Sequence, residues 1–238
     1  MSGAPSPWGP RWSRWVGRFL ARVYWNTEVK GRDNIPATGP VLVLANHIGL
    51  IDGPVVHGVI PRPSHFLITA RMMDGPLGIF LKPAAQIRVE GAGRTALAQA
   101  LAVLERGGVV GVFPEGHRGA GTADQTYGGA AWLAVRSGAS VVPAAVVGTR
   151  NTGESVNIWP RPRRRMLVAF GPAVQLEPPA GLTGRGRQEW AAEQVDQMLV
   201  THLREALAHT DLALPTDEDT ADAAPGTTAP AGEEDAHE

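Results

Sequence analysis

The chain has no cysteine, only two lysines and no long uninterrupted apolar segment. Without cysteine it can form neither a disulfide nor a thiolate metal site, and the composition is compatible with a reducing compartment. Because no run of about 18 uncharged apolar residues occurs, the sequence predicts no conventional transmembrane helix. Arginines interrupt the first apolar segment, so we expect no signal peptide there either. With two lysines and no recognisable nucleic-acid motif, we expect no nucleic-acid partner.

The 238 residues, 43% of them apolar, are enough for a domain with its own core. Charge is distributed unevenly: residues 215–238 hold eight acids and no base, which leaves 15 acids against 22 bases, a net charge of +7, in residues 1–214. A basic body favours anionic partners such as phosphate groups or lipid headgroups. The acidic end lacks aromatic residues and is typical of a disordered tail.

Residues 8–23 have the period of an amphipathic helix, with large apolar side chains on one face and arginines opposite them at about 100° per residue. The apolar set is Trp8, Trp12, Trp15, Val16, Phe19, Leu20 and Val23, and the arginines are Arg11, Arg14, Arg18 and Arg22. Tryptophan beside arginine is typical of a helix that lies in a membrane interface. The alternative is a helix that packs on the protein's own core with solvated arginines.

Farther along, short apolar runs alternate with helical segments. Strands are predicted at 41–45, 65–69, 84–89, 109–113, 141–147 and 166–170, and helices at 54–60, 94–106, 129–137 and 187–209. This alternation predicts an α/β fold in which a mostly parallel sheet is flanked by helices. We therefore expect an amphipathic helix over residues 1–25, one α/β domain over 26–210 and a disordered acidic tail over 211–238.

The first apolar strand runs directly into Asn46 and His47, and Asp52 follows five residues after the histidine. Ligand sites in open α/β sheets lie at the carboxyl ends of strands. Histidine is a natural general base for a hydroxyl, and a carboxylate can fix its tautomer. Regular helix would separate the two side chains, so the pairing needs an irregular stretch, which Gly49 can supply. Asp52 can also cap the following helix, either instead of the histidine pairing or beside it through its other carboxylate oxygen.

A second polar cluster follows later strands. The strand at 109–113 ends in Phe113-Pro-Glu-Gly-His-Arg-Gly119, and Arg88 ends the preceding run Gln-Ile-Arg. Glu115 and Arg118 held between glycines can form an anion-handling loop, with Arg88 at the same sheet edge. The alternative is a structural arginine–glutamate pair. A basic segment at 161–165 is either a phosphate-facing patch or a solvated loop.

Together these blocks resemble the four ordered motifs of the glycerolipid acyltransferases, whose best-known members acylate 1-acyl-glycerol-3-phosphate. The blocks are Asn46-His47-x-x-x-x-Asp52, Arg88, Phe113–Gly119 and Val141–Val147, and the resemblance covers roughly residues 25–175. The sequence differs from the family's usual residues at Gly49, His117 and Gly119, positions that bear on the acceptor.

The resemblance implies an O-acyltransferase that moves a fatty acyl group from an acyl-CoA or acyl-carrier-protein thioester to a lysophospholipid hydroxyl. It implies His47 as the base and Asp52 as its orienting partner, with no metal, no cofactor and no covalent intermediate. Substrate binding falls to Asn46, Arg88, Glu115, Gly116 and Arg118. With the first helix on an anionic membrane surface, the protein is expected to be peripheral at the cytoplasmic face of the cell membrane.

Four alternatives remain at this point. Another lysolipid or a glycolipid could be the acceptor. Gly91-Ala-Gly-Arg-Thr-Ala96 fits the G-x-G-x-x-A form of the dinucleotide motif, with Glu115 some twenty residues on. A metal hydrolase could use His47, Asp52, His57, His65 or His117, although their spacing matches no standard zinc pattern. A non-catalytic membrane-binding protein would need the first helix alone.

Overall fold

A computed structural model describes residues 3–114 and 128–217 of the chain. Its strands are β1 (Asn26–Lys30), β2 (Val41–Ala45), β3 (Ser64–Thr69), β4 (Ile87–Val89), β5 (Val109–Val112), β6 (Ser140–Val147), β7 (Arg165–Phe170) and β8 (Val174–Gln175). Its helices are α1 (Trp8–Phe19), the π-helix η1 (Leu20–Tyr24), the 3₁₀-helix η2 (Arg32–Asn34), α2 (Asp52–Val59), α3 (Ala70–Asp74), α4 (Gly78–Leu81), α5 (Arg94–Glu105), α6 (Gly128–Ser137) and α7 (Gly184–Ala208).

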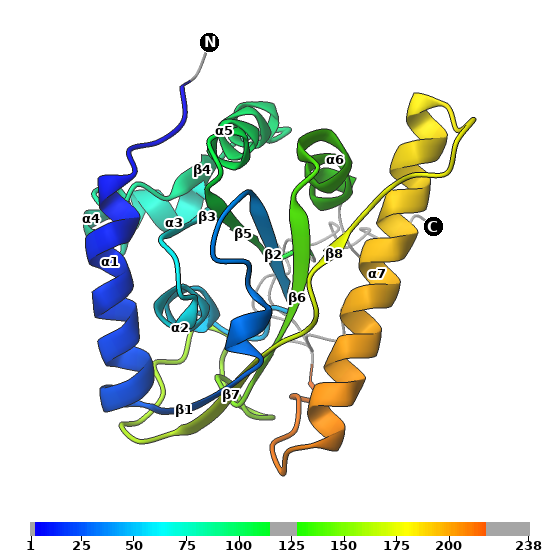
Figure 1. The fold of residues 1–238 in the computed structure, drawn as a ribbon. Coiled ribbons are helices and arrows are strands. Elements are labelled where there is room, and N and C mark those ends of the chain that lie inside the picture. Colours follow the sequence, from blue (N-terminus) through cyan, green and yellow to red (C-terminus); the bar gives the residue numbers. More distant parts are fainter. Residues whose placement is uncertain (1–2, 115–127, 218–238) are drawn as a thin grey trace, which may run out of the picture.

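One sheet occupies the centre of the molecule, with helices on both faces (Figure 1). The side chains of β2 point alternately to the two faces of the sheet. Val41, Val43 and Ala45 join the cluster formed with α2, while Leu42 and Leu44 join the cluster formed with α5, α6 and α7. A strand that is buried on both faces has a continuous apolar sequence, which is why β2 could be predicted from the sequence. Helix α1 packs against α2, so it forms an outer layer on that side.

The predicted α/β class is confirmed. The strand order is β1-β7-β6-β2-β5-β3-β4, with β8 paired to β6, and β2 is parallel to both of its neighbours, β5 and β6. Two pairs are antiparallel, β6 with β7 and β6 with β8. The sequence did not predict β1, β8, α3 and α4, because these elements are short or carry exposed polar residues.

Helix α1 and η1 bear out the predicted helix, but the large apolar face points away from the protein. Trp8 is 69% exposed, Trp15 58% and Phe19 55%. The side that packs on α2 carries small residues, and a Cβ added to Gly17 would lie 2.6 Å from the carbonyl oxygen of Pro54. The prediction that arginines lie opposite the apolar face is therefore wrong. Small residues lie there because only they allow such a close approach of two helices.

After α7 the chain returns to the domain. Leu212 and Leu214 pack on the cluster beneath α7, and Asp211 forms a bidentate ion pair with Arg165 at 2.7 and 2.8 Å. The predicted start of the tail at residue 211 is therefore too early, since residues 211–217 have partners in the fold. The prediction of disorder for 218–238 concerns residues outside the described part of the chain. Within the described ranges, no helix combines the length and apolarity needed to cross a bilayer.

Candidate active site

His47 and Asp52 form the centre of the candidate site. The Nδ1 atom of His47 lies 2.8 Å from Oδ2 of Asp52, as the spacing of the two residues predicts. The same carboxylate oxygen accepts hydrogen bonds from the backbone N–H groups of Ile48 and Gly49, at 2.7 and 2.8 Å. The loop between β2 and α2 thus folds around the carboxylate. Asp52 does not cap α2: the N-cap position is Ile51, and no side chain caps the helix there.

The two side chains of this pair differ in burial. The Asp52 side chain is fully buried, whereas the His47 side chain keeps 14% of its surface exposed. The carboxylate faces Nδ1, so Nε2 lies on the opposite edge of the ring from Asp52. A histidine held in one tautomer by a buried carboxylate is the arrangement required of a general base that acts on a hydroxyl group.

Three neighbouring strands bring the site together. Strand β5 lies on one side of β2, with Leu44 opposite Val112, and β6 lies on the other side, with Ala45 opposite Ala144. The three strands are parallel, so the residues that follow them meet at one edge of the sheet.

Two residues at this edge were not assigned a role from the sequence. Phe113 follows β5, and its ring stacks on the His47 imidazole with centroids 4.1 Å apart and planes 16° apart. Thr149 comes just after β6, and its Oγ1 donates a 2.5 Å hydrogen bond to Oδ1 of Asp52. The signal that could have identified both is their position directly after the two strands that flank β2.

Asn46 forms hydrogen bonds within the protein through both the nitrogen and the oxygen of its side-chain amide. Its Nδ2 donates to the carbonyl of Val146 at 3.0 Å, and its Oδ1 accepts from the N–H of Val146 at 2.7 Å. The residue is 1% exposed. Asn46 therefore extends the link between β2 and β6 by side-chain hydrogen bonds, and substrate contact by this residue stays a prediction.

Arg88 lies on β4, at the end of the sheet order, where acidic neighbours hold it. Its two terminal nitrogens each lie 2.6 Å from an Asp74 carboxylate oxygen, and its Nε contacts Glu90. These partners raise the pKa of Arg88, and Arg88 in turn holds the pKa of Asp74 below its usual range. Glu115, Gly116 and Arg118 lie outside the described residues, so a shared phosphate site of these residues and Arg88 stays a prediction.

The remaining sequence motifs have simpler structural roles in the described residues. Gly91–Gly93 form the turn between the edge strand β4 and α5. In the basic segment at 161–165, Arg164 pairs with Glu154 at 2.5 and 2.8 Å and Arg165 pairs with Asp211, so both are structural ion pairs. No group of three histidine or acidic side chains suited to a metal ion occurs in residues 3–114 and 128–217.

Comparison with known proteins identifies the family to which this chain belongs. The family model named Acyltransferase matches residues 26–147, slightly more than half of the chain, a segment that runs from β1 to the end of β6 and contains the His47–Asp52 pair. The chain therefore belongs to the acyltransferase family, and the predicted resemblance is confirmed at that level.

Several relatives are similar over much of the chain. An uncharacterized protein of Mycobacterium leprae is 30% identical over 183 residues, which cover 70% of this chain and 48% of that protein. An uncharacterized protein of Mycobacterium tuberculosis is 29% identical over 181 residues, 70% of this chain and 50% of its own. The 1-acyl-sn-glycerol-3-phosphate acyltransferase of Borreliella burgdorferi is 26% identical over 132 residues, 52% of either chain. The chain thus spans about half the length of the curated relatives it matches.

A solved structure has the same fold. The crystal structure of the 1-acyl-sn-glycerophosphate acyltransferase PlsC from Thermotoga maritima matches with a TM-score of 0.63 and 20% sequence identity, over 85% of this chain and 81% of that one. A match that covers most of both chains confirms the architecture of a mostly parallel sheet flanked by helices.

Proposed function

We propose that this protein transfers a fatty acyl group from an acyl-CoA or acyl-carrier-protein thioester to the hydroxyl of a lysophospholipid, in particular 1-acyl-glycerol-3-phosphate, to give phosphatidate. The observation that carries the proposal is the 2.8 Å contact between His47 and a buried, fully hydrogen-bonded Asp52 at the carboxyl end of β2. Membership of the acyltransferase family and the similarity to the 1-acyl-sn-glycerol-3-phosphate acyltransferase of Borreliella burgdorferi support this choice of reaction.

The proposed reaction needs one proton carrier and no group from outside the chain. Nε2 of His47 takes the proton of the acceptor hydroxyl as the oxygen attacks the thioester carbonyl carbon, and a C–O bond forms. The tetrahedral intermediate then breaks its C–S bond, and the imidazolium returns the proton to the departing sulfur. Asp52 keeps the ring in one tautomer and stabilises the imidazolium between these two steps.

In this proposal the acceptor phosphate is bound by arginine. Arg88 and Arg118, with Glu115 and Gly116 between them in sequence, are the residues to which the family resemblance gives this role. Arg88 is already paired with Asp74 and Glu90, so a phosphate that binds it must share or displace one of these carboxylates. A different lysolipid or a glycolipid is the second candidate acceptor.

The membrane is the proposed partner surface, with the protein peripheral at the cytoplasmic face of the cell membrane. The support is what we call the apolar surface, made of Trp8, Trp12, Trp15, Val16, Phe19 and Val23 on α1 and η1 and of Ile79 and Phe80 on α4, all of them at least 43% exposed. The two parts adjoin, because a Cβ on Gly9 would touch Ala84 and Ala85 just beyond α4. Arginine guanidinium groups lie over the Trp8 and Trp15 rings and supply positive charge for anionic headgroups.

The decisive assay is thioester-dependent acylation of a panel of lysolipids by the wild type and by His47→Ala. We expect the variant to lose turnover, while a matched His209→Ala variant, altered at an exposed histidine beyond α7, retains it. Full turnover by His47→Ala would refute the mechanism. Preference for lysophospholipids without a phosphate monoester would instead reassign the acceptor.

Vesicle flotation tests the membrane proposal independently of chemistry. Trp12→Ser combined with Trp15→Ser should reduce binding to vesicles that contain phosphatidylglycerol. Val174→Ser, which alters an exposed apolar residue of β8, should bind as the wild type does. Equal binding by the wild type, the double tryptophan variant and Val174→Ser would show that α1 does not contact the membrane. A protein that binds vesicles but acylates no lysolipid would favour the non-catalytic alternative.

A further inference from the structure

The Asp52 carboxylate is held by four hydrogen bonds, and one of them comes from a distant part of the chain. Oδ2 accepts from His47, Ile48 and Gly49, all in the loop directly before Asp52. Oδ1 accepts from Thr149, 97 residues further along the chain. The local loop therefore satisfies one oxygen, and the orientation of the carboxylate plane depends on the bond from Thr149 to the other.

Thr149 is itself placed by a sharp turn at the end of β6. Gly148 has a φ of +85°, and a Cβ there would lie 2.6 Å from the carbonyl oxygen of Arg165. Glycine is needed for this turn, since a side chain would both strain the backbone and collide with β7. Thr149 is fully buried, so its hydroxyl has no access to solvent water in place of Asp52.

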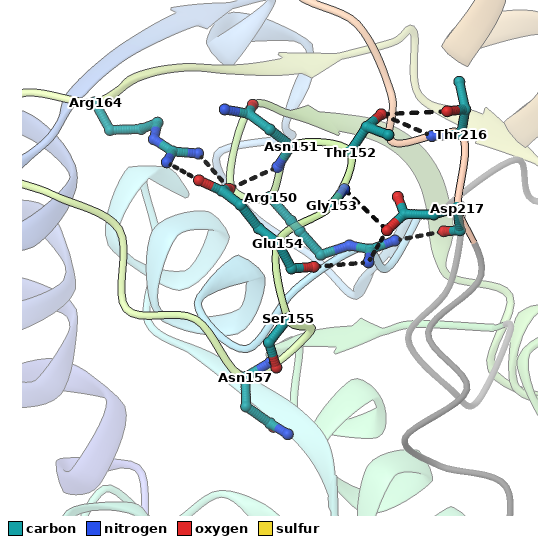
Figure 2. A network of polar contacts seen from close by, with 10 residues as sticks. All are labelled: Arg150, Asn151, Thr152, Gly153, Glu154, Ser155, Asn157, Arg164, Thr216 and Asp217. Carbon is teal, nitrogen blue, oxygen red and sulfur yellow. Dashed lines mark hydrogen bonds and ion pairs between the residues drawn. The ribbon is translucent and has the colours of Figure 1, made fainter.

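The next residue, Arg150, joins this turn to residues 216–217. Arg150 is fully buried, and its Nη1 donates to the carbonyl of Glu154 at 3.1 Å. Its Nη2 donates to the backbone carbonyl of Asp217 at 2.8 Å, and the Asp217 carboxylate lies 3.6 Å from Nη1. Figure 2 shows Asp217 and Thr216 reaching the loop that follows β6.

Residues 216–217 hold that loop at further points. Oδ2 of Asp217 accepts from the N–H of Gly153 at 3.0 Å, and the N–H of Thr216 donates to Oγ1 of Thr152 at 3.1 Å. On the far side of the loop, Glu154 is fixed by Arg164 (Figure 2). The loop that carries Thr149 is thus fastened from both sides.

We infer that Thr149 is a positioning residue for the proposed acyl transfer, and that residues 216–217 maintain its position through Arg150. The inference rests on the proposed function, because it concerns the orientation of the Asp52 carboxylate that holds His47. Without the Thr149 hydroxyl, the buried Oδ1 of Asp52 loses this hydrogen bond, and the carboxylate can rotate. The imidazole then loses its fixed direction toward the acceptor, although no group that binds substrate has changed.

Thr149→Val removes the hydroxyl at nearly constant volume, and Thr149→Ser keeps it. We expect Thr149→Val to lower kcat by roughly 10- to 100-fold, by analogy with the loss of hydrogen-bonding partners that orient metal-bound histidines. KM for the lysolipid and for the thioester should stay as in the wild type, and Thr149→Ser should restore most of kcat. Thr149→Ala, which removes the hydroxyl without adding bulk, answers the same question if the valine variant does not fold.

Asp217→Ala tests the second part of the inference. It removes a carboxylate that lies 3.6 Å from a buried guanidinium and the bond to Gly153, so kcat should fall with KM unchanged, but less than in Thr149→Val. Asp211→Ala is the matched control, since it removes an exposed ion pair from the same segment and should leave kcat as it is.

Each outcome has one meaning. Wild-type kcat in Thr149→Val, or equal losses in the valine and serine variants, overturns the positioning role. Wild-type kcat in Asp217→Ala, with a loss in Thr149→Val, overturns the role of residues 216–217. These results are read only where His47→Ala is inactive. An active His47→Ala would overturn the proposed function itself, whatever Thr149 does.

Discussion

Acidification from pH 7 to pH 4 should destabilise the fold through His57, a buried histidine on α2. Its Nε2 lies 3.0 Å from Oγ of Ser13 on α1, and its Nδ1 lies 2.8 Å from Oγ of Ser64 on β3. The residue is only 7% exposed. Burial, together with the nearby charges of His65 and Arg14, lowers the pKa of His57 from 6.5 to about 4.

The size and sign of the effect follow from that pKa. Well above pH 6.5 the His57 imidazole is neutral in both the folded and the unfolded chain, and it contributes no pH dependence. Between pH 6.5 and about 4 the unfolded chain takes up a proton that the folded chain does not, so the free energy of unfolding falls. At 1.36 kcal/mol per pH unit, the full loss is about 3 kcal/mol. Burial lowers the pKa of His65 as well, which adds to the effect in the same direction.

Urea unfolding at a series of pH values, followed by circular dichroism, measures this loss. The comparison is with His57→Gln, which keeps a donor and an acceptor but does not titrate. Carboxylates contribute equally to both proteins, so the difference between the two pH profiles isolates His57. The two profiles should separate progressively below pH 6.5, and parallel profiles down to pH 4 would refute the argument.

Three further substitutions test the packing and the site. Gly58→Ala would bring a Cβ to 2.1 Å from the carbonyl carbon of Gly17 and should cost about 1–3 kcal/mol in unfolding experiments, whereas Gly184→Ala, with open space around it, should be neutral. Asn46→Leu leaves a buried N–H and carbonyl of β6 unpaired and should lower stability by about 1–3 kcal/mol for each group in thermal melts; an unchanged melting temperature would contradict this. Phe113→Leu removes the ring stacked on the His47 imidazole and should reduce kcat more than thermal stability; steady-state kinetics and thermal melts of one preparation compare the two losses, and a larger loss of stability would contradict the prediction.

The sequence predicted those parts of the fold whose pattern is local. β2 and β6 are continuous apolar runs because both faces of the sheet are covered, and their positions agree with the structure within a residue. The pairing of His47 with Asp52 was also predictable, since only four residues, in an irregular loop, separate the two groups. By contrast, β1 has alternating exposed and buried residues and a polar composition, so it gave no clear signal.

The contacts that the sequence did not predict join distant segments. The bond from Thr149 to Asp52 depends on β6 lying beside β2, and strand order is a property of the folded sheet. The orientation of α1 could not be predicted from the sequence for a related reason. Its period shows that one face is apolar, but only the neighbouring helix shows that the small residues, and not the tryptophans, face inward.

Helix α2 begins at the candidate active site and contacts α1 near its other end, and it is only eight residues long. Asp52 forms its first residue, and Gly58 meets the backbone of α1 six residues later, which is roughly 9 Å along the axis at 1.5 Å per residue. So short a rod cannot bend appreciably. In the proposed membrane-bound state, the fold then fixes the height of the His47 Nε2 atom above the lipid plane. In that state, the distance by which an acceptor's hydroxyl projects from the bilayer helps to decide whether it reaches this atom.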